Sequence, residues 1–347
     1  MSDSILLSEI AEQPAALEQL LHAETLPVRS IAQALNQRNI TYVLIVARGT
    51  SDNAARYAQY LFGTTLGLPV ALATPSLHTR YGAKLRFDGA LAIGISQSGQ
   101  SPDICAVLED ARRAGAPTVA ITNDPSSPLA ATADHVIPLH VGTERSVAAT
   151  KSYTGQLTAL ALLILSMAGD ETGLQMLAQA PQALAATLTL APRIDEIAQV
   201  LRNATTMVAI GRGYNYATAW EIAQKVKELT YVPIEPYSAA DFQHGPIAIV
   251  ENGFPVLLIA TQGAVASDLV SIAGKLRERG ALLVAISDVP EILSLASEPI
   301  VLPVTVDERF SVLTSIVPGQ FLSVALARAR GIDPDQPRGL NKVTATR

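Results

Sequence analysis

Residues 42–51 read Tyr42-Val-Leu-Ile-Val-Ala-Arg-Gly-Thr-Ser51, and this stretch decides the fold because Met207-Val-Ala-Ile-Gly-Arg-Gly-Tyr-Asn215 nearly repeats it. A second pair agrees: Gly115-Ala-Pro-Thr-Val-Ala-Ile-Thr-Asn-Asp124 is matched by Gly280-Ala-Leu-Leu-Val-Ala-Ile-Ser-Asp288. Both pairs are offset by about 165 residues, which is the length of a domain and not of a short solenoid repeat. The chain therefore contains two copies of one fold, and differences between the copies indicate where chemistry takes place.

Each copy shows short apolar runs that alternate with amphipathic helical patterns, which is typical of a parallel sheet covered by helices on both faces. We predict two α/β domains of flavodoxin-like topology. The predicted strands are Tyr42–Val46, Leu91–Ile95, Thr118–Ile121 and His135–Leu139, then Met207–Ile210, Val256–Ile259, Leu282–Ile286 and Ile300–Val304. The predicted domain plan is N-terminal helices over 1–40, a first domain over 41–165, a helical linker over 166–203, a second domain over 204–335 and a tail over 336–347.

The composition limits the possible function classes. A hydrophobic content of 49% with 16% charged residues is typical of a packed globular protein, and a net charge of −6 argues against a nucleic-acid partner. The single cysteine, Cys105, favours the reducing cytoplasm, and the N-terminus shows no signal peptide. The apolar run Ala159–Leu165 is too short to span a membrane, and the scattered histidines do not have metal-site spacing. We expect a cytoplasmic protein without metal or cofactor.

Hydroxyl-rich turns follow three predicted strands of the first copy. They are Gly49-Thr50-Ser51, Ser96-Gln97-Ser98-Gly99-Gln100-Ser101 and Thr122-Asn123. Such turns at helix N-termini can bind a phosphate through hydroxyl and backbone N–H groups. Each turn alone is better explained as a helix N-cap, but three such turns at adjacent strand ends favour a phosphate site. The second copy has Ala260-Thr-Gln-Gly-Ala264 and Tyr214-Asn215 instead, which favours a phosphate pocket in the first copy, and neither copy has a nucleotide-binding fingerprint.

Around Ser96-Gln-Ser-Gly-Gln-Ser101 the chain resembles the SIS (sugar isomerase) phosphosugar-binding domains. The resemblance extends over about residues 40–347, and it is specific because several motifs occur in fixed order: Val147-Ala-Ala-Thr-Lys-Ser-Tyr153, Gly211-Arg-Gly213, Glu221 through Glu228, His244-Gly-Pro246 and Asp333 through Lys342. Together they look like the isomerase half of glucosamine-6-phosphate synthase. The resemblance implies two flavodoxin-like domains, with the sugar phosphate bound by the serine/threonine loop of the first domain.

The resemblance also implies the site residues. The substrate would contact Thr50, Ser51, Ser96, Gln97, Ser98 and Ser101, together with Val147 and Ala149. Glu228 would be the base that moves a proton between C1 and C2, and Lys225, three residues earlier on a predicted helix, would assist it. His244 would open the sugar ring from the neighbouring subunit of a homodimer, and Lys342 would form a Schiff base with the ketose. Without the resemblance, Lys225 and Glu228 are interpreted as a surface ion pair. His244 is then interpreted as a structural histidine and Lys342 as a solvated lysine.

The sequence departs from the synthase in two respects. We expect no glutaminase domain, and Cys105 favours a packed thiol instead of a nucleophile. Gln100, Ser101 and Ala149 replace the usual Glu, Thr and Ser, which looks more like the stand-alone glucosamine-6-phosphate deaminases. The hypothesis is therefore a deaminase that gives fructose 6-phosphate and ammonia. A related phosphosugar isomerase or deglycase, and a non-catalytic phosphosugar sensor, remain as alternatives.

Overall fold

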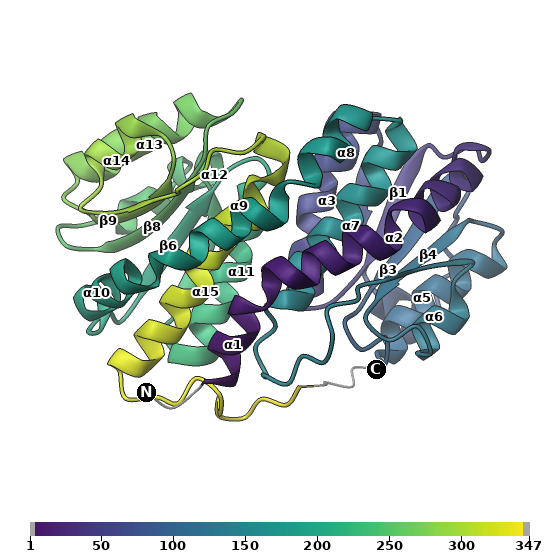
Figure 1. Cartoon of the computed structure of the whole chain (residues 1–347), viewed down its shortest axis with the longest axis horizontal. Coiled ribbons are helices and arrows are strands. Elements are labelled where there is room, and N and C mark those ends of the chain that lie inside the picture. Colours follow the sequence, from purple (N-terminus) through teal and green to yellow (C-terminus); the bar gives the residue numbers. More distant parts are fainter. Residues whose placement is uncertain (1–3, 343–347) are drawn as a thin grey trace. The chain divides into compact units, whose positions relative to one another are not determined.

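The computed structural model describes residues 4–342. The chain divides into two compact units, each built around one five-stranded parallel sheet (Figure 1). We call them the first-sheet unit, with residues 15–144, 151–179 and 341–342, and the second-sheet unit, with residues 4–14, 145–150 and 180–340. Each unit is described by itself below.

The sheet of the first-sheet unit has the strand order β2-β1-β3-β4-β5, with every pair parallel. Its strands are β1 (Tyr42–Val46), β2 (Val70–Leu72), β3 (Ala90–Ile95), β4 (Thr118–Thr122) and β5 (His135–Pro138). The inner strands β3 and β4 are buried along their whole length, as the apolar runs without alternation predict for a sheet covered on both faces.

Helices cover both faces of this sheet. Helix α3 packs with α7 and helix α5 packs with α6, so the two pairs form separate layers (Figure 1). Behind α5 and α6 lies a core cluster that includes Val107, Leu108 and Leu129. The helices of this unit are α2 (Gln13–Asn36), α3 (Thr50–Leu66), α4 (Ser76–Thr79), α5 (Pro102–Arg113), α6 (Pro128–Thr132), α7 (Lys151–Ala168) and α8 (Glu171–Leu177).

The second-sheet unit repeats this topology with the strand order β10-β9-β8-β6-β7. Its strands are β6 (Met207–Gly211), β7 (Ile234–Ser238), β8 (Pro255–Ala260), β9 (Leu282–Ser287) and β10 (Glu298–Val301). In chain order, the first strand again lies between the second and the third, as in the first-sheet unit. This identity of strand order confirms that the sequence repeat is a repeat of fold.

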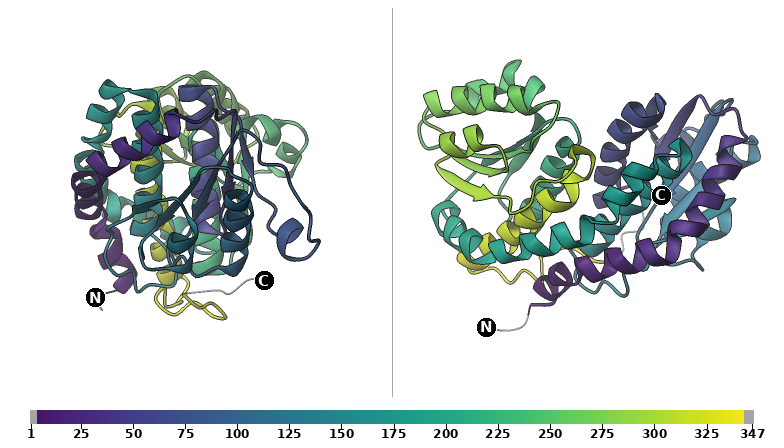
Figure 2. Two further views of the ribbon diagram at one scale, coloured as in Figure 1. Left: turned by 90° about the vertical axis from the view of Figure 1, so that its right-hand side faces the viewer. Right: turned by 45° about the horizontal axis from the view of Figure 1, so that its top comes forward.

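Helices α11 and α15 pack together in this unit, and α13 packs with α14 (Figure 2). The helices are α1 (Ile5–Ala11), α9 (Ala180–Thr187), α10 (Ala191–Leu201), α11 (Asn215–Thr230), α12 (Ala239–Gln243), α13 (Ala266–Glu278), α14 (Pro290–Leu295) and α15 (Ser311–Ala329), with short 3-10 turns at Leu188–Leu190, Pro246–Ile249 and Glu308–Phe310. The stretch Glu308–Ala329 is long and apolar enough to cross a membrane, but its apolar window is completely buried within the protein. That burial is typical of a core helix.

The predicted fold class is confirmed: two α/β units with parallel sheets and flavodoxin-like strand order. All eight predicted strands form, although the last lies at Glu298–Val301, earlier than the predicted Ile300–Val304. The sequence interpretation missed β2 and β7. Both are edge strands, where partial exposure weakens the apolar pattern, and β7 contains Pro236, which an edge position tolerates.

Candidate functional site

Three turns of the first-sheet unit meet at the carboxyl ends of β1, β3 and β4. The backbone N–H of Asn123, after β4, donates to the carbonyl of Gln97, after β3, at 3.1 Å. Arg48, after β1, binds the carboxylate of Asp103 in the first turn of α5, with Nε 2.9 Å from Oδ2. Parallel strands present their carboxyl ends at one edge, which is where ligands bind in open α/β sheets. The predicted turns are therefore neighbours.

The hydroxyls of these turns organise the loop backbone. Ser96 Oγ accepts the N–H of Gly99 at 3.1 Å, and Ser98 Oγ accepts the N–H of Gln100 at 3.3 Å. Ser51 Oγ accepts Nε2 of Gln156, from α7, at 3.0 Å. Thr50 begins α3 and Ser101 immediately precedes α5. Thr50, Ser51 and Ser101 thus lie at two helix N-termini, where the helix dipoles favour an anion. Ser96, Gln97 and Ser98 lie in the turn after β3, at the same edge of the sheet.

The turn after β3 depends on glycine at position 99. Gly99 has a φ of +63°, in the left-handed region, and a Cβ at this position would lie 2.1 Å from Ser127 Oγ. Ser127 cannot move away freely, because its Oγ caps α6 by accepting the N–H of Ala130. The glycine therefore lets the loop backbone lie close to Ser127, at the N-terminus of α6.

Gly99→Ala should therefore lower the free energy of unfolding by about 1–2 kcal/mol for the left-handed backbone and about 1–3 kcal/mol more for the overpacking. Gly67 provides the matched control, because its φ is +67° and no atom lies within 4 Å of its added Cβ. Gly67→Ala should show the backbone cost alone. Urea denaturation of both variants measures the difference, and equal losses would contradict the packing at Ser127.

The equivalent turn of the second-sheet unit is closed by carboxylates. The N–H of Ala264 donates to Glu308 at 2.8 Å, and the N–H of Gln262 donates to Asp288 at 2.8 Å. The Glu308 carboxylate also fills the space beside Gly263, since an added Cβ there would lie 2.2 Å from its Cδ. Two negative charges thus occupy the donors that a phosphate would need in this copy.

An arginine after the first strand of each sheet was not among the predicted site residues. In the first-sheet unit Arg48 pairs with Asp103, and in the second-sheet unit Arg212 pairs with Asp268 at 3.0 Å. Both pairs join the turn after the first strand to the helix that follows the third. Because the ion pair occurs in both copies, it is a feature of the fold. The sequence signal for this pair is the Arg-Gly dipeptide that follows the first strand of each copy, at Arg48-Gly49 and at Arg212-Gly213.

A buried acid–base cluster lies on α11 of the second-sheet unit. Lys225 Nζ is 2.5 Å from Glu228 Oε2 and 3.6 Å from Glu221 Oε1. The side chains of Glu221 and Lys225 are 0% and 3% exposed, whereas Glu228 is 22% exposed, so Glu228 alone faces solvent. Gln224 Nε2 donates to the other Glu228 oxygen at 2.8 Å. Lys225 and Glu228 share a helix face, as expected, and the burial of the lysine excludes the alternative of a surface ion pair.

His244 follows α12, and its backbone N–H donates to the carbonyl of Asp241 at 3.0 Å. The residue is exposed, as the Gly-Pro turn behind it predicts. His244 thus follows α12, whereas Lys225 and Glu228 lie on α11.

Lys342 is paired with a buried carboxylate in the first-sheet unit. Its Nζ lies 2.6 Å from Oε2 of Glu144, whose side chain is 0% exposed. Ser152 fixes the same carboxylate, through its N–H at 3.1 Å and its hydroxyl at 2.7 Å. Lys342 is therefore not a freely solvated charge. Glu144 was missed by the sequence interpretation, because it lies 198 residues from Lys342.

Val147 and Ala149, the remaining predicted substrate residues, are half-buried in the 145–150 segment of the second-sheet unit. Their neighbours Ala148 and Thr150 line a small cavity together with Lys225 of α11 and Gln320 of α15. The cavity leaves no room for a water molecule. The 145–150 segment and the helix that carries the acid–base cluster thus line the same cavity.

Burial changes the acidity of two groups near the phosphate turns. It raises the pKa of the half-buried Cys105 thiol, and the negative charge of Asp103 raises it further. Burial also raises the pKa of Asp52, against the opposing charges of Arg56 and Arg48. A raised thiol pKa lowers the thiolate fraction, so Cys105 has the character of a packed thiol and not of a nucleophile.

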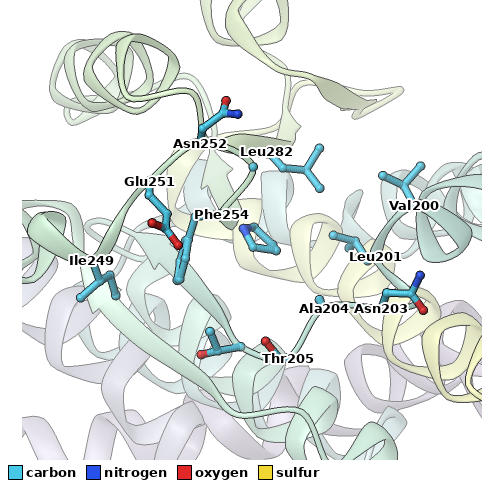
Figure 3. A pocket seen from close by; sticks show the side chains of 13 residues that line it. Val200, Leu201, Asn203, Ala204, Thr205, Ile249, Glu251, Asn252, Phe254 and Leu282 are labelled. Atoms are coloured by element: carbon cyan, nitrogen blue, oxygen red, sulfur yellow. The ribbon is translucent and has the colours of Figure 1, made fainter.

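A hollow of about 440 Å³ opens at the opposite, amino-terminal edge of the second sheet, and Phe254, Glu251 and Leu282 are among the residues that line it (Figure 3). The equivalent edge of the first sheet has a hollow of about 320 Å³, lined by residues that include Phe87, Asp88 and Pro117. Because both copies carry the hollow before the same strands, it is a feature of the fold. Among residues 4–342, no group of three His, Cys, Asp or Glu side chains could hold a metal ion.

Comparison with known proteins agrees with this arrangement. Residues 36–166 and 200–327 each match the model of the SIS domain. The chain is 36% identical to glutamine–fructose-6-phosphate aminotransferase [isomerizing] of Thermococcus kodakarensis and 35% identical to that of Methanothermobacter thermautotrophicus, over 97% and 98% of its length. It spans only 57% of each relative. The solved C-terminal domain of glucosamine-fructose-6-phosphate aminotransferase from Francisella tularensis superposes with a TM-score of 0.87 at 28% identity, covering 96% of this chain and 98% of that one.

Proposed function

Because the chain belongs to the SIS-domain family, we propose that it is a phosphosugar enzyme that converts glucosamine 6-phosphate into fructose 6-phosphate and ammonia. The observation that carries the proposal is the buried Glu221–Lys225–Glu228 cluster, in which only Glu228 is open to solvent. A solvent-facing carboxylate beside a buried ammonium is suited to proton transfer at a bound sugar. The sequence variants Gln100, Ser101 and Ala149 favour the deaminase over other members of the family.

The phosphate is held, in this proposal, by the turns after β1 and β3. The N-termini of α3 and α5 supply backbone N–H groups, and Thr50, Ser51, Ser96, Ser98 and Ser101 supply hydroxyls. The corresponding turn in the second copy already has Glu308 and Asp288 bound to its N–H groups. A phosphate dianion would be repelled there. We therefore assign phosphate binding to the first copy and proton transfer to the second.

Glu228 acts as the base. It removes the proton from C2 of the open-chain amino aldose, the electron pair forms the C1–C2 double bond, and the aldehyde oxygen takes a proton from solvent to become the enol hydroxyl. The proton from C2 is then delivered to C1, and the 2-amino group gives up one proton to solvent. The product is the 2-imine of fructose 6-phosphate. Lys225 holds the Glu228 carboxyl group in position during both transfers, because its buried Nζ lies 2.5 Å from Oε2. This role accounts for the burial of the lysine, whose side chain is 3% exposed.

Lys342 releases the ammonia. Its neutral amine attacks C2 of the protonated imine, ammonia leaves, and water hydrolyses the resulting lysine iminium to the ketose. The amine must first lose a proton. Glu144 is placed to accept it, because its carboxylate lies 2.6 Å from Nζ.

The test is to incubate the protein with glucosamine 6-phosphate and to measure ammonia and fructose 6-phosphate together. Equal amounts of the two support the deaminase. Interconversion of aldose and ketose phosphates without ammonia would favour the alternative of a phosphosugar isomerase, and ammonia or amine from a different sugar phosphate would favour a deglycase. Binding of the sugar without any turnover would contradict the enzyme and favour a sensor.

We further propose that the enzyme works as a cytoplasmic homodimer in which His244 opens the sugar ring in the partner's site. The support is that His244 is exposed at the end of α12. Glu228→Gln chains and His244→Ala chains, each impaired alone, should regain up to about a quarter of wild-type turnover when mixed and allowed to exchange subunits. Mixtures that stay as impaired as their components would contradict the shared site.

A further inference from the structure

The 145–150 segment is held in place by one buried carboxylate from the N-terminal helix α1. Glu9 is 2% exposed. It accepts the backbone N–H of Arg145 at 2.5 Å and that of Ser146 at 3.2 Å, and the Ser146 hydroxyl also contacts it. A carboxylate buried among three donors is a stable anchor, and removing it would leave those donors without a partner.

Helix α1 is itself fixed at both ends. At its N-terminus, Asp335 accepts the N–H of Ile5 at 3.1 Å and that of Leu6 at 2.9 Å. Just after its C-terminus, Gln13 Nε2 donates to Oε1 of Gln320, from α15, at 2.8 Å. Figure 1 shows α1 beside α15, and the two helices are in contact. The anchor that Glu9 provides is therefore rigid.

The anchored 145–150 segment lines a cavity together with α11, the helix that carries the acid–base cluster. Ala148, two residues after Ser146, lines this small cavity. Leu6 and Ile10 of α1 and Lys225 of α11 line the same cavity. Ala148 and Thr150 line this small cavity together with Lys225, so a shift of the segment would change the packing around Lys225. Lys225 in turn holds Glu228 at 2.5 Å.

From these contacts we propose that Glu9 is a positioning residue for the reaction: it fixes the 145–150 segment against Lys225 and so fixes the orientation of Glu228. The proposal rests on the proposed function for its kinetic readout only. Glu9 acts through the 145–150 segment, and it is assigned no contact with the substrate. Its effect should therefore appear in kcat and not in phosphate binding, because Glu9 belongs to the second-sheet unit and the phosphate turns belong to the first-sheet unit.

The test compares Glu9→Gln with Glu12→Gln, the same change at an exposed position just after the same helix. Glutamine presents an N–H₂ group where the segment needs an acceptor, so a displaced loop should result. We expect Glu9→Gln to lower kcat about tenfold or more, with KM for glucosamine 6-phosphate within about threefold of wild type. The backbone amides of Arg145 and Ser146 should also exchange with solvent faster. Glu12→Gln should change none of these.

Equal kcat and equal amide exchange in the two variants would overturn the proposal. A Glu9→Gln variant with a lowered Tm but an unchanged kcat while folded would also overturn it, because the residue would then be only structural. If Glu9→Gln does not fold, Ser146→Ala removes one donor alone and should lower kcat about threefold. If wild type does not turn over glucosamine 6-phosphate, the proposed function fails, and amide exchange alone decides the role of Glu9.

Discussion

Glu228→Gln is expected to lower kcat for glucosamine 6-phosphate by about 10²–10⁴-fold, the range for loss of a general base. A glutamine amide cannot accept a proton from C2, although it has nearly the shape of the carboxylate. Its carbonyl can still accept a hydrogen bond from Lys225, and Glu221, 3.6 Å from Lys225, still balances that charge. The variant should therefore fold, and the Kd of an unreactive analogue such as glucitol 6-phosphate should change by less than about threefold.

Glu278→Gln is the matched control for this prediction, because Glu278 is exposed at the end of α13 in the same unit. It should keep wild-type kcat. Steady-state kinetics and calorimetric titration of the analogue separate the two effects. A Glu228→Gln enzyme that keeps kcat, or one that loses turnover only because it no longer binds the analogue, would remove Glu228 from the role of base.

Lys342→Arg is expected to lower kcat about 10²-fold or more. Arginine keeps a positive charge beside Glu144, so the buried carboxylate retains a partner, but a guanidinium stays protonated and cannot form an imine. Borohydride reduction in the presence of fructose 6-phosphate should attach the sugar covalently to Lys342 in the wild type. The variant should give no adduct at this position.

Lys227→Arg tests whether the adduct is specific, because Lys227 is an exposed lysine on α11. It should keep both turnover and the adduct. Mass spectrometry of the reduced peptides locates the sugar. An adduct on another lysine, or normal turnover by Lys342→Arg, would show that ammonia leaves without the covalent step.

The fold could be predicted from the sequence because the repeat and the buried apolar runs are local signals. Residues of β3 and β4 are buried on both faces, so their composition alone marks them as strands. The edge strand β2 has only three residues, none of them buried, and gives no such signal. The carboxyl-edge position of Ser96 and Ser98 followed from the topology, since a turn after a parallel strand lies at that edge.

The partners of the site residues could not be predicted in the same way. Glu9 contacts Arg145 across 136 residues and Glu144 contacts Lys342 across 198, and no local spacing encodes these distances. The burial of Lys225 also depends on packing from other segments, because its helix carries charged residues that are equally compatible with a surface. The carboxylates that close the second turn come from two separate loops, at Asp288 and Glu308. Such contacts appear only when the chain is folded.

The fate of the hydrogen on C2 tests the central claim most directly, and glucosamine 6-phosphate deuterated at C2 provides the measurement. Abstraction by Glu228 predicts that ammonia and fructose 6-phosphate form together, with the deuterium found on C1 of the ketose or in the water by NMR, and that the labelled substrate reacts more slowly. A sugar product that still carries deuterium on C2 would contradict the account, because ammonia would then have been displaced without any proton transfer between C2 and C1.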